Sequence, residues 1–442
     1  MHSRNSRHPR SLLRALTITV ATAVVLTGCG AASDTASPAS TAPSADGGSG
    51  SDGSISGHGA VAGATEMPEP QLGLATVASG GDVALLDLDT GESAGVGALG
   101  DVASVTTNGR YLFATLASGE GVTIVDSGAW TVPHGDHFHY YLATPRVVGT
   151  VEGTVSSGIP AVVASGTSRT ALFFGETGTG IVLDGDALGS GSIEEIARIE
   201  SAPHNGALVP VGDLLLGTVA DEAGISLAVQ VYNGDGTAVA GEASRADCAE
   251  FSGTITTNVG VVFGCADGVL LATEAEAGEG SAAITFERIP YPDGTAPADR
   301  ATAFDSRIGR PSVAAVAGTA GAWLLNTRER TLTLVPTDTP LLLASAVSDT
   351  AGMIVAVALD GRVLVIDPAT GLTVSATEPL LAASLADSEL RAGVTLQVDA
   401  SRAYVNAAAE NLVYEIDFAD GARIARSLPA PTTPVHFAEI GR

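Results

Sequence analysis

The chain has 442 residues, with 49 acidic and 21 basic side chains and a formal net charge of −28. Nucleic acids and anionic lipids are bound mainly through Lys and Arg, so this charge disfavours both as partners and favours cations. No lysine occurs in the chain. A P-loop, a pyridoxal Schiff base and a lysine nucleophile are therefore excluded, because each requires the amine.

Residues 1–28 have the pattern of a lipoprotein signal peptide. Four arginines (Arg4, Arg7, Arg10 and Arg14) precede the apolar stretch 15–25, which is too short to span a bilayer. Cys29 follows Leu-Thr-Gly directly and resembles the lipidated cysteine of a bacterial lipobox. We expect lipidated Cys29 to hold the mature protein on the outer face of the cytoplasmic membrane. The alternative is an ordinary signal peptide with a chance cysteine.

Residues 29–67 are predicted to be the lipidated cysteine followed by a flexible, low-complexity tether. Ser, Ala, Gly, Thr, Asp and Pro dominate this segment, which has too few large apolar side chains to offset its ordering entropy. Its one histidine, His58, would contribute to a metal site only if the tether folded back. Without the signal peptide, the chain keeps 17 of its 21 basic residues and all 49 acidic ones, so its formal net charge is −32.

Residues 68–442 are predicted to form a single all-β domain, a β-propeller. An alternating strand ending in Asp and followed by a turn recurs clearly at Asp87, Asp126, Asp367 and Asp417, with weaker copies near Asp184, Asn233, Thr273 and Val335. The mean spacing is about 47 residues, the length of a four-stranded blade. Eight blades are expected, with seven as the alternative. We expect each terminal Asp to cap its turn, and the only plausible helical turn is at 192–199.

Cys248 and Cys265 are an even pair in a chain predicted to be exported. With Cys29 lipidated, a disulfide between them is the natural assignment. A thiolate metal site is the alternative reading.

Three histidines lie within six residues of one another in the sequence HGDHFH, residues 134–139. His137 and His139 would share one face of an extended chain, and Gly135 would allow a turn that brings His134 to them. Neutral imidazole is a common zinc ligand. Asp136 would either ligate the metal or fix the tautomer of a ligating histidine.

Two further histidines are candidate ligands. His204 precedes an expected innermost strand, and His436 follows the last blade, where the chain end usually completes the first blade. Both positions can border the central opening. The 134–139 motif falls between the third and fourth strands of its blade, so an extended loop is needed if all five histidines are to meet.

Residues 132–141, Pro203-His204-Asn205-Gly206 and Val435-His436, together with the cysteine pair, resemble the AztD-type zinc metallochaperones. The resemblance implies a monomeric exported propeller that binds Zn²⁺ and delivers it to the solute-binding protein of a zinc ABC importer. It implies a metal site and no enzymatic activity. The alternatives are a metal-dependent or quinoprotein-like enzyme and a metal-free propeller that presents a protein-binding surface.

Overall fold

The computed structural model of the chain describes residues 61–442 except 135, 157–160, 167 and 276–282. The predicted signal peptide, Cys29, His58 and Gly135 lie outside the described residues. The described residues all fall in one compact unit, Ser54–Arg442. Within these described residues, no helix has the length and apolar character needed to cross a membrane.

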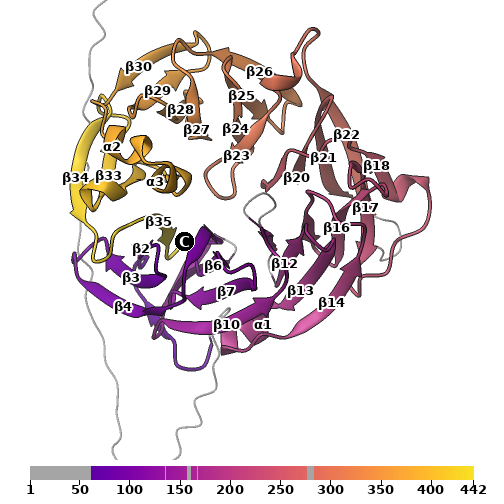
Figure 1. Ribbon diagram of the computed structural model, residues 1–442, viewed down its shortest axis with the longest axis horizontal. Helices are drawn as coiled ribbons and strands as arrows, with labels where there is room; N and C mark the ends of the chain where they lie inside the picture. Colours follow the sequence, from indigo (N-terminus) through magenta and orange to yellow (C-terminus); the bar gives the residue numbers. More distant parts are fainter. Residues whose placement is uncertain (1–60, 135, 157–160, 167, 276–282) are drawn as a thin grey trace, which may run out of the picture. The chain divides into compact units, whose positions relative to one another are not determined.

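Eight four-stranded antiparallel sheets follow one another around a ring, as Figure 1 shows. Four of them, from the inner to the outer strand, are β35 (His436–Ile440), β2 (Gly73–Val77), β3 (Asp82–Asp87), β4 (Ser93–Ala98); β5 (Val102–Thr107), β6 (Tyr111–Leu116), β7 (Gly121–Asp126), β10 (Arg146–Glu152); β11 (Val162–Ser165), β12 (Arg169–Phe174), β13 (Thr179–Asp184), β14 (Glu195–Glu200); β15 (Leu208–Val211), β16 (Leu214–Ala220), β17 (Ser226–Asn233), β18 (Arg245–Asp247).

The other four are β19 (Gly253–Thr256), β20 (Val261–Cys265), β21 (Gly268–Ala275), β22 (Ala283–Pro290); β23 (Thr302–Asp305), β24 (Ser312–Ala317), β25 (Gly321–Asn326), β26 (Thr331–Pro336); β27 (Leu341–Ala346), β28 (Ile354–Ala358), β29 (Val363–Asp367), β30 (Leu372–Ala376); β31 (Leu396–Val398), β32 (Ala403–Ala407), β33 (Leu412–Asp417), β34 (Arg423–Pro429). The predicted all-β propeller is confirmed, and the described residues give one four-stranded sheet for each of the eight expected repeats.

Burial within each sheet explains its sequence pattern. The second strand of a sheet is covered on both faces by neighbouring sheets, so β28 is apolar throughout and every residue of it is buried. The outer strands β4 and β30 are largely exposed; β4 carries mostly small residues, whereas β30 exposes Leu372 and Val374. Packing between adjacent sheets therefore forms the core, and the outermost strands contribute little to it.

The chain end closes the ring. Strand β35 pairs antiparallel with β2, so residues 436–440 supply the innermost strand of the first sheet, as the position of His436 predicted. Of the predicted terminal aspartates, Asp87 caps its turn by accepting the N–H groups of Asp89 and Thr90 at 2.8 Å. The predicted copy at Val335 was wrongly placed, because that residue lies in the outer strand β26.

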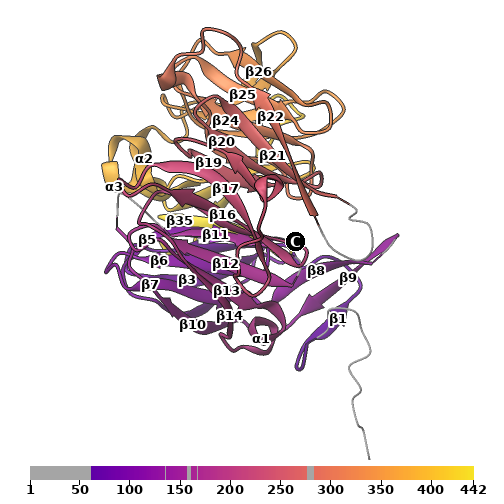
Figure 2. The same cartoon turned by 90° about the vertical axis from the view of Figure 1, so that its right-hand side faces the viewer.

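A three-stranded sheet extends from the second four-stranded sheet. Strands β8 (Ala129–His134) and β9 (His137–Leu142) form a hairpin between β7 and β10, the third and fourth strands, as expected. Strand β1 (Thr65–Met67) pairs with the other edge of β9. Figure 2 shows this hairpin reaching beyond the stacked strands. The predicted tether boundary at residue 67 is corrected, because Thr65–Met67 is held by this backbone pairing.

The helices lie where the sequence did not indicate them. Residues 195–200 form β14, so the predicted helical turn at 192–199 was wrong. The short helices are α1 (Gly185–Ser190), α2 (Ala382–Ala386) and α3 (Ser388–Ala392), with 3-10 turns at Glu242–Ser244, Pro297–Asp299 and Ala408–Glu410. Asp184 caps α1 by accepting the N–H of Ala187, whereas the sequence pattern predicted only the end of a strand at this residue.

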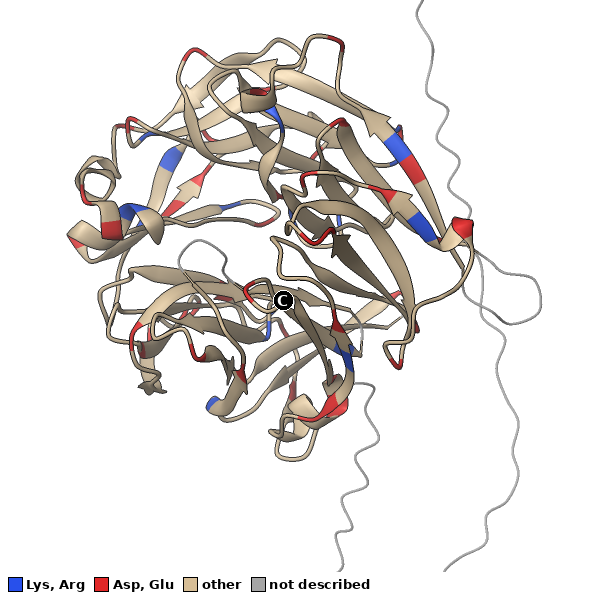
Figure 3. Cartoon of the chain, turned by 45° about the vertical axis from the view of Figure 1, so that its right-hand side comes forward, with Lys and Arg blue, Asp and Glu red and all other residues tan. Residues whose placement is uncertain are grey.

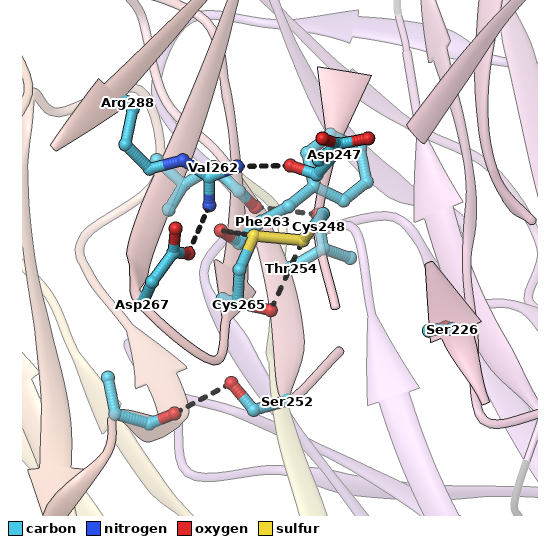
Figure 4. The surroundings of a disulfide bond; sticks show 12 residues. Ser226, Asp247, Cys248, Ser252, Thr254, Val262, Phe263, Cys265, Asp267 and Arg288 are labelled. Atoms are coloured by element: carbon cyan, nitrogen blue, oxygen red, sulfur yellow. Dashed lines mark hydrogen bonds and ion pairs between the residues drawn. A yellow bond between two sulfur atoms is a disulfide. The ribbon is translucent and has the colours of Figure 1, made fainter. Parts of the chain in front are cut away.

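The predicted disulfide between Cys248 and Cys265 is present. It joins the residue that follows β18 to the end of β20 and so links two adjacent sheets (Figure 4). Arg288 strengthens the same junction by pairing with Asp267 at 2.6 Å and by donating to the carbonyl of Asp247. With both sulfurs in this bond, the alternative thiolate metal site is excluded.

Candidate metal centre

One face of the three-stranded sheet gathers the histidines. Because side chains alternate along a strand, His137, His139 and Tyr141 of β9 point to the same side. His134 is the cross-strand partner of His137, and Trp130 is the partner of Tyr141. Glu66 of β1 lies opposite Tyr141 on the other edge. The pairing register alone therefore places these side chains on a common face.

Three imidazole nitrogens form a nearly equilateral triangle. Nδ1 of His134 lies 3.4 Å from Nε2 of His137, which lies 3.2 Å from Nε2 of His139, and the third edge is 3.5 Å. Zinc–nitrogen bonds of about 2.0–2.1 Å in tetrahedral geometry require nitrogens about 3.3–3.4 Å apart. The triangle thus has the dimensions of one face of a tetrahedral zinc site. Among the described residues, these three are the only group of at least three His, Cys, Asp or Glu side chains placed to share a metal ion.

Two carboxylates fix the tautomers of the histidines. Nδ1 of His139 lies 2.6 Å from Oε1 of Glu66, and Nδ1 of His137 lies 3.1 Å from Oδ1 of Asp136. Each Nδ1–H donates to its carboxylate, which leaves the lone pair on Nε2. The hydrogen bond from His137 lowers the pKa of Asp136. Two lone pairs then face each other at 3.2 Å, an arrangement that a bound cation relieves.

An aromatic stack connects the site to a buried ion pair. The rings of His139 and Tyr141 stack with their centroids 6.4 Å apart, and the rings of Tyr141 and Trp130 stack with their centroids 5.3 Å apart. The guanidinium carbon of Arg110 lies 3.7 Å from the centroid of the Trp130 ring, a cation–π contact. Arg110 is bidentate to Asp126, which is almost completely buried. The base of the hairpin is therefore anchored in the core of the propeller.

The tip of the hairpin is open to solvent. The side chain of His137 is 54% exposed and that of His139 is 20% exposed. Phe138, between them on the opposite face, is 57% exposed. An incoming ligand can therefore reach the triangle directly, which suits metal exchange.

His204 does not join the three hairpin histidines. It is 2% exposed and packs edge-on against Phe173. Its Nδ1 lies 2.7 Å from the carbonyl of Ala202 and its Nε2 lies 2.8 Å from Oγ1 of Thr218. Burial lowers the pKa of His204 and favours the neutral ring. Both ring nitrogens are thus engaged within the fold.

His436 is likewise a buried residue of the first sheet. It is 6% exposed in β35, and its Nε2 lies 3.4 Å from the carbonyl of Val102. Burial lowers its pKa. The expectation that all five histidines meet is corrected: the structure brings together His134, His137 and His139, because the hairpin extends away from the sheets that bury the other two.

Sequence reasoning missed Glu66. It lies within the segment read as a tether, 73 positions before the histidine that it contacts. Met67, a large apolar residue at the end of this polar segment, was the only local signal of a strand there. Asp136 was predicted either to ligate or to fix a tautomer, and its contact with Nδ1 of His137 matches the second role.

No family model matches the sequence. Among solved structures, the crystal structure of AztD from Citrobacter koseri matches with a TM-score of 0.68 and 18% identity, covering 84% of this chain and 97% of that one. A structure of apo AztD from the same organism gives the same values. The chain has an AztD-type fold. This resemblance confirms the architecture implied by the sequence, and the AztD-type fold by itself assigns no ligand, since one fold hosts many functions.

Proposed function

We propose that the protein is an extracytoplasmic zinc metallochaperone that delivers Zn²⁺ to the solute-binding protein of a zinc ABC importer. The observation that carries the proposal is the nitrogen triangle of His134, His137 and His139, whose edges fit a tetrahedral zinc site. The AztD-type fold supports the same function. In this proposal Cys29 anchors the monomeric protein beside its partner on the outer face of the cytoplasmic membrane.

Three protein nitrogens leave one tetrahedral position for a further ligand. A donor from the partner enters at this exposed position, and the hairpin histidines then leave one at a time. Glu66 and Asp136 keep His139 and His137 in the metal-binding tautomer throughout, because they hold the proton on Nδ1. His134 and His137 are both exposed, so an incoming ligand displaces one of these two before the less exposed His139.

Zinc titration of the mature protein against a chromophoric chelator tests the site. We expect one high-affinity Zn²⁺ per chain, lost in the double variant His137→Ala with His139→Ala. His204→Gln is the matched control, because this histidine lies outside the triangle. Unchanged binding in the double variant would refute the assignment.

A transfer experiment tests delivery. Zinc-loaded protein is mixed with the solute-binding protein, and the transfer rate is compared with the release of zinc to a chelator. Direct handover predicts transfer faster than release. Equal rates would mean that zinc passes through solution and would refute the chaperone mechanism.

Hydrolysis is the competing use of a three-histidine zinc site with an open position, since zinc-bound water can attack an ester. Both nearby carboxylates accept hydrogen bonds from ligating histidines, so their role in the site is to orient those ligands. We expect zinc-loaded protein to hydrolyse nitrophenyl esters no faster than free zinc. Saturable turnover that disappears with the zinc would favour the enzyme.

A further inference from the structure

The hairpin of β8 and β9 has a second face, which zinc binding does not use. Phe138, Tyr140 and Leu142 alternate with the histidines along β9, so they point to the opposite side of the strand. Strand pairing places Pro133 beside Phe138 and Met67 beside Tyr140 on this side. These five residues form an uncharged, mainly apolar surface, which we call the back face of the hairpin.

The back face is fixed at its base and exposed toward its tip. At the base, Oγ1 of Thr131 donates to the carbonyl of Gly441 at 2.8 Å, which ties the hairpin to the chain end. Farther along, Phe138 is 57% exposed, Leu142 is 40% exposed and Pro133 is exposed as well. The hairpin projects beyond the stacked strands (Figure 2). Contiguous apolar surface that is held in water in this way marks a site of protein interaction.

The charges around the tip indicate what kind of surface it meets. Strands β1, β8 and β9 and the turn of the hairpin contain two carboxylates, Glu66 and Asp136, and no Lys or Arg. The side chain of Asp136 is fully exposed at the tip. Acidic residues are also spread over the ring, where basic ones are few, as Figure 3 shows. An acidic partner surface would be repelled, so the matching surface is apolar with a neutral or basic rim.

The two faces of the hairpin together set the shape of the partner. The nitrogen triangle opens on one face, and Phe138, between His137 and His139 in sequence, lies on the other. A partner that met only the histidine face would leave Phe138 in water. A partner that met only the back face would not reach the metal. Both faces are covered when the tip of the hairpin enters a cleft.

We propose that the tip of the hairpin inserts into the cleft of the solute-binding protein. One wall of the cleft is apolar and packs on Phe138 and the rest of the back face, and the other wall supplies the incoming zinc ligand. Solute-binding proteins close by a hinge around what they bind, which provides such a cleft. The apolar contact holds the two proteins together while the histidines leave, and it uses no nitrogen of the triangle. This inference rests on the proposed zinc delivery.

Transfer kinetics of Phe138→Ser test the proposal. We expect zinc affinity and zinc release to a chelator to be unchanged, because this side chain points away from the triangle. The second-order rate of transfer to the zinc-free solute-binding protein is expected to fall at least ~10-fold, since aromatic anchors supply much of the binding energy of an interface. Leu372→Ser is the matched control, because Leu372 is 64% exposed on β30, in a different sheet.

Each outcome of the kinetic test has a distinct meaning. Transfer by Phe138→Ser at the rate of the parent protein would overturn the docking proposal and leave zinc delivery intact. Transfer by the parent protein no faster than its release of zinc to a chelator would instead refute delivery itself. An equal loss of rate in Leu372→Ser would mean that any exposed apolar residue matters, and would also overturn the docking proposal.

Crosslinking locates the contact without removing the aromatic ring. Phe138 is replaced by the photoreactive analogue p-benzoylphenylalanine, and the zinc-loaded protein is irradiated with the zinc-free solute-binding protein. We expect crosslinks to residues that line the cleft of the partner, and none when the same analogue replaces Leu372. Crosslinks confined to the outer surface of the partner, or no crosslink from position 138, would contradict insertion into the cleft.

Discussion

Oε1 of Glu66 lies 2.6 Å from Nδ1 of His139, across 73 positions of sequence. This contact ties the first described strand of the chain to the proposed zinc site and holds the proton of His139 on the nitrogen that does not face the triangle. Carboxylates that orient ligating histidines in this way raise metal affinity about 10–100-fold.

Glu66→Gln is therefore expected to weaken zinc binding about 10-fold, because a neutral amide oxygen is a poorer acceptor for the imidazole N–H. Competition titration with a chelator measures the change. Glu69→Gln is the control, since Glu69 is an exposed carboxylate three residues away whose side chain makes no ion pair with a described residue. An equal effect of both substitutions would mean that only net charge matters.

The stack from Arg110 through Trp130 and Tyr141 to His139 predicts that ring packing sets the orientation of His139. Tyr141→Phe keeps the stack and is expected to bind zinc normally, whereas Tyr141→Leu removes it and is expected to bind zinc several-fold more weakly. In a Trp323→Phe background, Trp130 is the only tryptophan, so its fluorescence should respond to zinc. Equal zinc affinities of the Phe and Leu variants would show that the stack does not position the ligand.

Much of the fold follows from the sequence because a propeller repeats one pattern. The strands that end at Asp87 and Asp417 are covered on both sides by adjacent sheets, and this burial requires apolar residues at a regular spacing. The short helices do not follow from sequence, since a single turn such as α1 depends on one capping aspartate. Five-residue helices have almost no periodicity to detect.

The site could be predicted only where its residues are close in sequence. His134, His137 and His139 lie on one hairpin, so the two-residue period of a strand brings them together. Glu66 reaches them through strand pairing, which leaves no local pattern. His204 looked like a ligand because histidine is rare in this chain, and it proves to be a hydrogen-bonded core residue.

Burial of His204 makes stability depend on pH. Its folded-state pKa lies below the ordinary value of 6.5, so the unfolded chain takes up the proton first as the pH falls. The stability that this residue contributes is complete above pH 6.5 and is lost as the pH falls from there toward the folded-state pKa. Denaturant unfolding at pH 7.5 and pH 5.5 should therefore show a smaller loss for His204→Gln than for the parent. Identical losses would contradict the buried, neutral histidine.

The disulfide predicts a stability effect that is separate from metal binding. Cys248 and Cys265 are 17 positions apart, and a loop of that size contributes about 3 kcal/mol in the chain-entropy model. The double variant Cys248→Ser with Cys265→Ser is expected to lower the free energy of unfolding by about this amount and to keep one zinc per chain. Loss of zinc in the folded double variant would implicate this junction in the metal site.

The position of the bound metal tests the central claim most directly. Crystals of zinc-loaded protein, measured on both sides of the zinc absorption edge, should show one anomalous peak bonded to Nδ1 of His134, Nε2 of His137 and Nε2 of His139, with the fourth position open to solvent. A peak at His204 or His436, or no ordered peak on the hairpin, would contradict the account.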